Sequence, residues 1–172
     1  YVMTANVLLD CKNIWKLYGA KANSILDTNV NPDINTLKAE GIIGAVRAVN
    51  VQIMQGEIFV IMGLSGSGKS TLLRVIAGLL TPTAGTIILN GQDISCVPTH
   101  LRSVGMIFQD NQLFPHLNVY DNVAFGLRMA KADKRVIAER CQELLNLVGL
   151  TEAAKQSVTT LSGGEAKRVT LA

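Results

Sequence analysis

The stretch "IFVIMGLSGSGKSTLLRVIAGLL", residues 58–80, places an apolar run, a glycine-rich loop and a helical pattern directly one after another. The apolar run at 58–62 shows no alternation, which is typical of a strand buried on both faces of a parallel sheet. Apolar residues then recur at helical spacing from Leu72 to Leu80, and Pro82 forbids a longer helix. The order strand, loop, helix predicts an α/β fold.

The loop itself, "GLSGSGKS" at 63–70, fits the phosphate-binding pattern G-x-x-x-x-G-K-[ST]. Its glycines lack a Cβ, so successive backbone N–H groups can converge on a phosphate at the positive end of the following helix. Lys69 has the reach to contact the β- and γ-phosphates, and the Ser70 hydroxyl is a ligand for the Mg²⁺ that bridges them. The nucleotide-binding residues predicted here are Gly63, Leu64, Ser65, Gly66, Ser67, Gly68, Lys69, Ser70 and Thr71.

Composition excludes several classes of protein. With 48% apolar and 17% charged residues over 172 positions, the chain is globular rather than disordered. Its net charge of +3 comes from scattered Lys and Arg, so no basic stripe supports nucleic-acid binding. No apolar run approaches the ~18–20 residues of a spanning helix, so a membrane role is peripheral. The three cysteines lie far apart in the sequence, which argues against a disulfide framework and a zinc site and fits a reducing cytoplasm. No export leader is evident.

The N-terminal part of the chain contains two further predicted strands separated by an irregular segment. Residues 13–19, "NIWKLYG", have the aromatic content of a short strand, and residues 49–54 alternate as a half-buried strand does. Between them, Asn and Asp residues surround Pro32, and such side chains favour turns. We interpret about residues 20–45 as an insert or a linker.

Beyond the glycine-rich loop, local patterns predict three more elements. "TIIL" before Asn90-Gly91 indicates a strand that enters a tight turn, and "VGMIF" at 104–108 indicates another short buried strand. Residues 133–148 carry apolar side chains on one helical face, with Asp133 as a cap and Gly149 at the far end. We therefore expect an amphipathic helix there.

The last stretch, "LSGGEAKRVTLA" at 161–172, is a helix start with an unusual composition. Ser162 and Glu165 have the S-x-x-E spacing of a capping box. Such a cap needs no glycine, and Gly163 and Gly164 each cost roughly 1 kcal/mol in a helix relative to alanine. Bare backbone at a positive helix end makes a second phosphate-binding surface. Two anion sites suggest one ligand between them.

These motifs together resemble the ATP-binding subunit of an ABC transporter. The resemblance rests on "GLSGSGKST", on Gln109 after "VGMIF", on "LFPHLNVYDNVAFGL" and on "LSGGE", and it covers about residues 46–172. "NIWKLYG" followed by an insert is similar to the glycine betaine/proline importer ATPases in particular. The resemblance implies a P-loop NTPase core at 1–109 with an insert at about 20–45, a helical subdomain at 110–160, and the signature motif with the start of its helix at 161–172.

The resemblance also implies roles for single residues. Tyr18 is the expected aromatic for stacking on adenine, with Trp15 as the alternative because of the insert, and core packing explains either ring equally well. Lys69 and Gln109 are the expected catalytic residues, and Ser70 and Gln109 the expected Mg²⁺ contacts. The signature residues expected to bind ATP held by the opposite subunit are Ser162, Gly163, Gly164 and Glu165.

Partners follow from the same resemblance. Two subunits would form a head-to-tail dimer around two ATP molecules, and the helical subdomain would dock on a membrane permease at the inner face of the cell membrane. The apolar segments "LFPHL" and "VAFGL" fit a docking surface or a small core equally well. No nucleic-acid partner and no transmembrane segment are expected.

Some parts of the family pattern have no counterpart in these residues. No apolar strand ending in Asp-Glu follows the signature, and His100, His116 and Asp110 precede it, so none fits the family's later catalytic positions. We therefore expect a partial chain, without the last core strands, that folds poorly by itself because 58–62 lacks ladder partners, and that binds nucleotide weakly and hydrolyses it negligibly. Two alternatives stay open: an ABC ATPase for a polyamine, sulfate or an amino acid, and a non-hydrolysing nucleotide-binding remnant.

Overall fold

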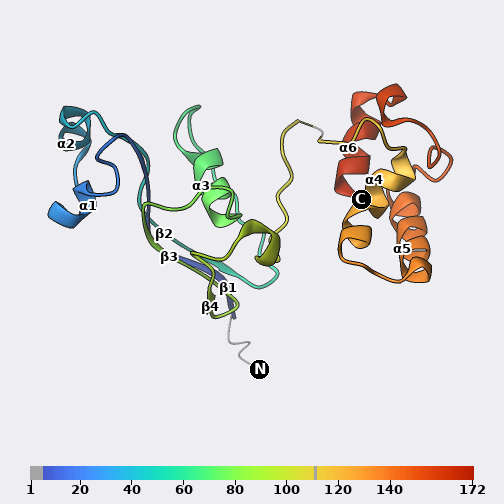
Figure 1. The fold of residues 1–172 in the computed structure, drawn as a ribbon, viewed down its shortest axis with the longest axis horizontal. Coiled ribbons are helices and arrows are strands. Elements are labelled where there is room, and N and C mark those ends of the chain that lie inside the picture. Colours follow the sequence, from blue (N-terminus) through green and yellow to red (C-terminus); the bar gives the residue numbers. More distant parts are fainter. Residues whose placement is uncertain (1–5, 111) are drawn as a thin grey trace. The chain divides into compact units, whose positions relative to one another are not determined.

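A computed structural model describes residues 6–110 and 112–172 of the chain. The fold has two compact units, Tyr1–Gly105 and Met106–Ala172 (Figure 1). Among the described residues, the first unit contains the sheet and the glycine-rich loop, and the second unit is helical. The predicted α/β class is confirmed.

The sheet of the first unit has four antiparallel strands in the order β2-β1-β3-β4. The predicted strands at 13–19 and 49–54 are present and extend further toward the N-terminus than expected. A turn with positive φ at both Asn90 (49°) and Gly91 (77°) joins the last two strands, which confirms the predicted tight turn. The strands are β1 (Val7–Tyr18), β2 (Ile43–Met54), β3 (Ala84–Leu89) and β4 (Gln92–Asp93).

The two buried strands predicted at 58–62 and 104–108 are wrong, and so is the parallel sheet inferred from them. Neither segment is helix or strand, and the side chains of Ile58 and Met62 are 91% and 86% exposed. A strand forms only where a neighbour completes its hydrogen-bond ladder, because apolar content alone does not pair its backbone. No described residue pairs with 58–62, and the four strands of the sheet pair only with one another.

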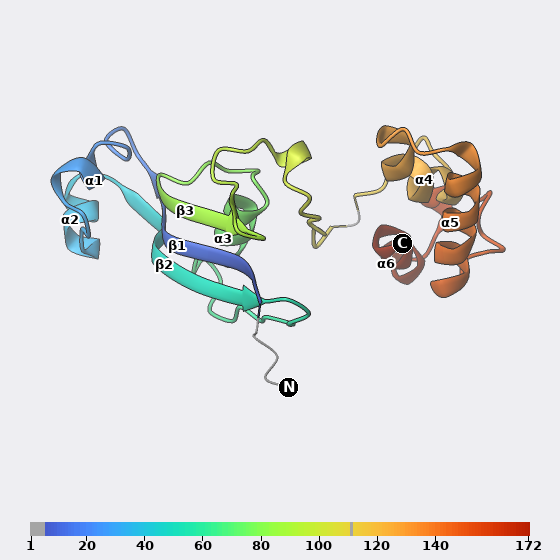
Figure 2. The same cartoon turned by 90° about the horizontal axis from the view of Figure 1, so that it is seen from below.

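Helix α3 (Lys69–Ile76) packs on one face of this sheet (Figure 2). It ends earlier than the apolar pattern to Leu80 predicted, because Gly78 adopts a φ of +80°. The Gly78 amide donates to the Val75 carbonyl and the Leu79 amide to the Arg74 carbonyl, at 3.1 and 2.9 Å, a paired C-terminal cap. The buried core here comprises Leu9, Cys11, Ile14, Val46, Leu72, Val75, Ile76, Ile87 and Ile94.

The segment between β1 and β2 is a folded insert rather than a flexible linker. It contains α1 (Ile25–Thr28) and α2 (Ile34–Ala39), which lie beyond the ends of β1 and β2 (Figure 1). The Asp33 carboxylate caps α2 by accepting a 2.7 Å hydrogen bond from the Thr36 amide. This insert lobe has its own buried cluster of Trp15, Leu17, Ala22, Ile25, Leu37 and Ile42.

The second unit contains helices α4 (Val119–Met129), α5 (Lys134–Leu147) and α6 (Gly163–Leu171). The predicted helix at 133–148 is confirmed as α5, because the Asp133 carboxylate accepts from the Arg135 amide at 2.8 Å and Gly149 follows its end with a φ of +68°. The core of this unit is formed by Val119, Leu145, Leu150, Ala153, Val158 and Val169.

Candidate phosphate-binding site

The glycine-rich loop leads directly into α3, as the sequence predicted. Gly66 and Gly68 have φ values of 77° and 89°, a left-handed backbone that side chains disfavour. Gly68 is the N-cap of α3 and supplies no side-chain hydrogen bond to it. The first amides of α3 therefore lack a side-chain acceptor from the cap position, which is the arrangement that receives an anion.

Close packing fixes the loop against the sheet. A Cβ added to Gly68 would collide with the backbone carbonyl oxygen of Ala45 in β2. A Cβ on Gly63 would lie 2.9 Å from the Ser67 Oγ, which is shorter than an ordinary contact. Glycine at these two positions lets the loop curl upon itself and lie directly on the β2 backbone, which holds the loop amides in place.

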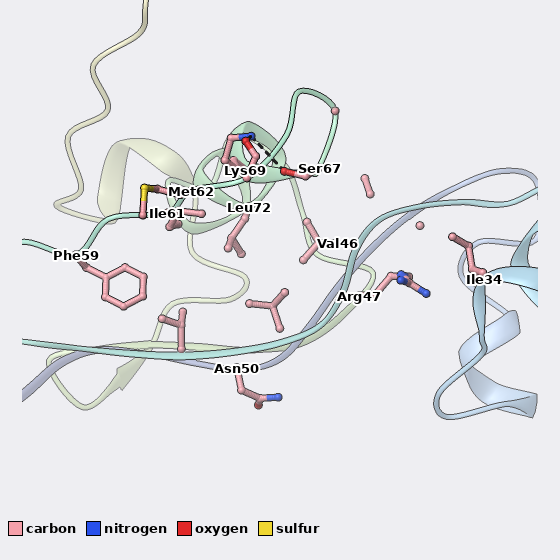
Figure 3. Close-up of a pocket in the computed structure, with 17 residues that line it drawn as sticks. Ile34, Val46, Arg47, Asn50, Phe59, Ile61, Met62, Ser67, Lys69 and Leu72 are labelled. Carbon is pink, nitrogen blue, oxygen red and sulfur yellow. Dashed lines mark hydrogen bonds between the residues drawn. The ribbon is translucent and has the colours of Figure 1, made fainter.

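Lys69 holds a positive charge inside the curl of the loop (Figure 3). Its Nζ donates to the carbonyl oxygens of Gly63 and Leu64 at 2.8 and 2.6 Å, and to the Ser67 Oγ at 3.2 Å. These acceptors are uncharged, so they do not neutralise the charge of the ammonium. Ammonium, glycines and open helix end together fit a polyphosphate.

A cavity of about 670 Å³ lies between the loop and strand β2 (Figure 3). Its volume lies within the ~300–1,000 Å³ range of small-molecule sites. Of the predicted phosphate-binding residues, Gly63, Gly66, Ser67, Gly68 and Lys69 line it. Leu64, Ser65, Ser70 and Thr71 do not line it, and their contacts with a nucleotide or Mg²⁺ stay predictions.

The lining residues of the cavity that were not predicted include a cation and a residue of the insert. Arg47 of β2 and Ile34 of α2 contribute to its wall. No sequence motif marks either residue, because strand pairing and the folding of the insert bring them to the loop.

The two aromatic residues proposed for adenine stacking have different environments. Trp15 is 1% exposed within the core of the insert lobe, and its Nε1 donates to the Asn13 Oδ1 at 3.1 Å. Its ring is therefore not available to a ligand. Tyr18 is 41% exposed beside the Lys16 ammonium, which lies 5.2 Å from the ring centroid, and it does not line the cavity. Stacking by Tyr18 stays a prediction.

The helix start at 161–172 has the predicted capping box. The Glu165 amide donates to the Ser162 Oγ at 3.3 Å, and the Ser162 amide donates to the Glu165 carboxylate at 2.8 Å. Hydrogen bonds from the Ser162 side chain and backbone hold the pKa of the Glu165 carboxyl below its ordinary value. The carboxylate thus stays charged at the start of α6.

The two signature glycines are not required by the packing of the second unit. A Cβ on Gly163 would meet nothing within 4 Å, and one on Gly164 would only approach the Arg168 Nη1 at 4.0 Å. Neither glycine has a positive φ. Packing within the second unit therefore does not explain why glycine occupies these two positions in the first turn of α6.

Gln109 and an aromatic loop complete the predicted features of the second unit. Gln109 is exposed, and its predicted contact with Mg²⁺ and the attacking water stays a prediction. Asn122 anchors the preceding loop, since its Oδ1 accepts from the Phe114 amide at 2.8 Å and its Nδ2 donates to the Asn118 carbonyl at 2.9 Å. Phe114 stacks on Phe125 with ring centroids 4.3 Å apart and stays 38% exposed.

Comparison with known proteins shows matches over most of the chain. The family model described as "ABC transporter" matches residues 46–172. The chain is 45% identical over 139 residues to the spermidine/putrescine import ATP-binding protein PotA of Fusobacterium nucleatum, covering 81% of the chain and 37% of that protein. It is 51% identical over 128 residues to the putrescine transport ATP-binding protein PotG of Escherichia coli, covering 74% and 34%.

The name of a third relative specifies another transported compound. The chain is 50% identical over 125 residues to the Fe(3+) ions import ATP-binding protein FbpC of Streptomyces avermitilis, covering 73% of the chain and 36% of that protein. The chain thus spans about a third of the length of the curated relatives it matches. None of the helices within residues 6–110 and 112–172 has the length and apolar content needed to cross a bilayer.

Proposed function

Because the chain belongs to the ABC transporter family, we propose that it is the nucleotide-binding part of an ATPase that powers an importer. The observation that carries the proposal is the loop at 63–70, in which Lys69 is held by uncharged acceptors at an open helix start. The loop amides bind the phosphates, and Lys69 neutralises their β and γ charge. Mg²⁺, when bound, would neutralise further phosphate charge, with Ser70 and Gln109 as its protein contacts.

The signature residues are proposed to act on a second nucleotide. Gly163 and Gly164 are dispensable for packing within the second unit, and phosphate binds well at the N-terminal end of a helix. We infer that Ser162, Gly163 and Gly164 contact ATP held by the loop of a second copy of the subunit, with Glu165 holding the cap. Two such copies then close head to tail around two ATP molecules.

Substitution of Gly164 by alanine tests this proposal. We expect Gly164→Ala to raise the stability of α6 by up to about 1 kcal/mol, because alanine is the better helix former. We also expect it to lower ATP hydrolysis by the full-length protein about tenfold, because the added methyl group keeps the second nucleotide from the α6 backbone. Steady-state ATP turnover and thermal unfolding of the same preparations give the two values.

Lys134→Ala, at the exposed first turn of α5, is the control, and it should leave turnover unchanged. A Gly164→Ala protein that hydrolyses ATP at the wild-type rate would show that the signature residues do not contribute to the nucleotide site. A wild-type protein that binds ATP but does not hydrolyse it would favour the alternative of a non-hydrolysing nucleotide-binding remnant.

The second unit is proposed to dock on a membrane permease at the inner face of the cell membrane. The half-exposed Phe114, stacked on Phe125 and held by Asn122, supports this role because exposed aromatic rings on an anchored loop are typical of binding surfaces. The subunit itself would then be cytoplasmic and peripheral.

The transported compound is a separate question. Names of the matched relatives specify polyamines and ferric iron. Glycine betaine or proline is proposed as the cargo only on the resemblance of "NIWKLYG" and the insert that follows it, whereas the names of the matched relatives favour a polyamine or ferric iron. On this proposal we expect deletion of the gene to reduce uptake of radiolabelled glycine betaine at least fivefold and to leave putrescine uptake unchanged. Loss of putrescine uptake alone would make the subunit a polyamine importer ATPase.

A further inference from the structure

One wall of the cavity beside the glycine-rich loop is formed by residues that belong to no recognised sequence motif. Arg47 and Ile34 line it, and Figure 3 shows Arg47 between Val46 and Ile34, away from the loop. Ile34 belongs to the insert lobe and is 49% exposed, which leaves an apolar edge at this wall. The opposite end of the cavity is lined mainly by apolar side chains, among them Val49, Phe59 and Ile61.

Arg47 is an exposed residue whose stem packs on its neighbours and whose guanidinium makes no hydrogen bond within the described part of the chain. A Cβ on Gly44 would lie 2.8 Å from the Arg47 Cδ and 2.9 Å from the Leu37 Cδ1, so the stem packs over the Gly44 backbone. The hydrogen bonds and ion pairs of residues 6–110 and 112–172 do not include the guanidinium, although its charge helps to lower the pKa of the Asp33 carboxyl. A planar cation with five N–H donors therefore lies at the cavity wall.

The position of Arg47 along β2 fits the nucleoside rather than the phosphates. The Ala45 carbonyl lies against Gly68 of the loop, and Arg47 follows two residues further along the strand. At ~3.3 Å per residue this places its backbone roughly 7 Å beyond the contact with the phosphate loop. Trp15 is buried and Tyr18 does not line the cavity, so neither ring occupies this wall.

We propose that Arg47 stacks its guanidinium plane on the base of the bound nucleotide, with Ile34 packing against the edge of the same base. The proposal rests on the proposed nucleotide-binding function. Guanidinium groups stack well on aromatic faces, whereas an ammonium group has no plane to offer. Through Ile34 the insert lobe contributes directly to the nucleotide site.

Binding of two ligands to the full-length protein tests this assignment. ATP and inorganic tripolyphosphate share the phosphate chain, but only ATP has a base. We expect Arg47→Ala to weaken ATP binding about tenfold and tripolyphosphate binding less than twofold, because only ATP has a base that can stack on the guanidinium. Lys69→Ala should weaken both ligands. Lys38→Ala, an exposed cation on α2 outside the cavity, should weaken neither.

The outcomes separate this proposal from the function on which it rests. Wild-type protein that binds neither ligand would contradict both. An Arg47→Ala protein that binds ATP with unchanged affinity, or that loses both ligands equally, would overturn the stacking role while the phosphate site stands. If Arg47→Ala does not fold, Arg47→Lys answers the same question, since it keeps the stem and the charge and should still lose ATP affinity about fivefold.

Discussion

Replacement of Lys69 by alanine is expected to weaken ATP binding by the full-length protein about 100-fold. The Lys69 Nζ lies between two loop carbonyls and the Ser67 hydroxyl, so its charge is held at the mouth of the loop before a ligand arrives. Hydrogen bonds to a charged group contribute ~1.5–3 kcal/mol each, and two lost phosphate contacts account for a change of this size. Titration calorimetry with ATP measures the affinity directly.

Lys131→Ala provides the control for this prediction, because it removes an exposed cation of the second unit that is not among the proposed ligand contacts. It should leave the affinity for ATP unchanged. Circular dichroism of the Lys69→Ala protein should match that of the wild type, since the side chain bonds only to the loop. Equal ATP affinity in the wild-type and Lys69→Ala proteins would show that this loop is not the phosphate site.

Features set by neighbouring residues could be predicted from the sequence. The capping box at Ser162, the Asp133 cap and the Asn90-Gly91 turn each depend on groups within a few residues, and all three are present. The phosphate loop belongs to the same class, because its glycines and the following helix start are contiguous. Local chemistry determines local backbone, so these patterns predict structure well.

Features that depend on distant partners could not be predicted in the same way. The apolar run at 58–62 has the composition of a buried strand, yet a strand needs another strand to complete its hydrogen bonds. The sheet that forms instead uses β1 as its centre, with β2 and β3 paired antiparallel on either side. Composition specifies the strand propensity of a segment but not the strand with which the segment would pair.

The residues of the candidate site divide in the same way, into those predicted from local sequence and those that depend on distant contacts. Lys69 and the loop glycines were predicted from the motif, whereas Arg47 reaches the cavity through the register of β2 and Ile34 through the fold of the insert. Arg102 was also missed, because its hydrogen-bond partners in α3 lie 26 and 27 residues before it. Nothing in the residues around Arg102 indicates a buried guanidinium.

Arg102→Ala is expected to lower the free energy of unfolding of the first unit by about 3 kcal/mol. Arg102 is only 4% exposed, and its guanidinium donates to the carbonyls of Val75 and Ile76 at the end of α3, at 3.1 and 3.0 Å. It also donates to the Val97 and Ser95 carbonyls, at 2.7 and 2.9 Å. Removing it takes this donor from the Ile76, Val97 and Ser95 carbonyls, while the Val75 carbonyl keeps the Gly78 amide, and each buried unsatisfied group costs ~1–3 kcal/mol before relaxation and water reduce the sum.

The Arg102 side chain packs closely on the backbone of Gly78. A Cβ on Gly78 would collide with the Arg102 Nε, so Gly78→Ala should destabilise the unit as well. Burial lowers the pKa of the guanidinium, but arginine stays charged, and its charge at the C-terminal end of α3 complements the helix dipole. The same helix begins at the phosphate loop, so Arg102 fixes the far end of the element that carries the site.

Amide hydrogen exchange of α3 in the full-length protein measures this effect locally, because the helix amides report the opening of the first unit. Arg140→Ala is the matched control, since its 2.8 Å bond to Glu143 lies at the surface and such pairs contribute ~0.2–1 kcal/mol. We expect protection of α3 to fall about 100-fold in Arg102→Ala and to stay unchanged in Arg140→Ala. Equal protection of α3 in both variants would mean that water replaces the guanidinium at the four carbonyls, and that α3 holds the phosphate loop without it.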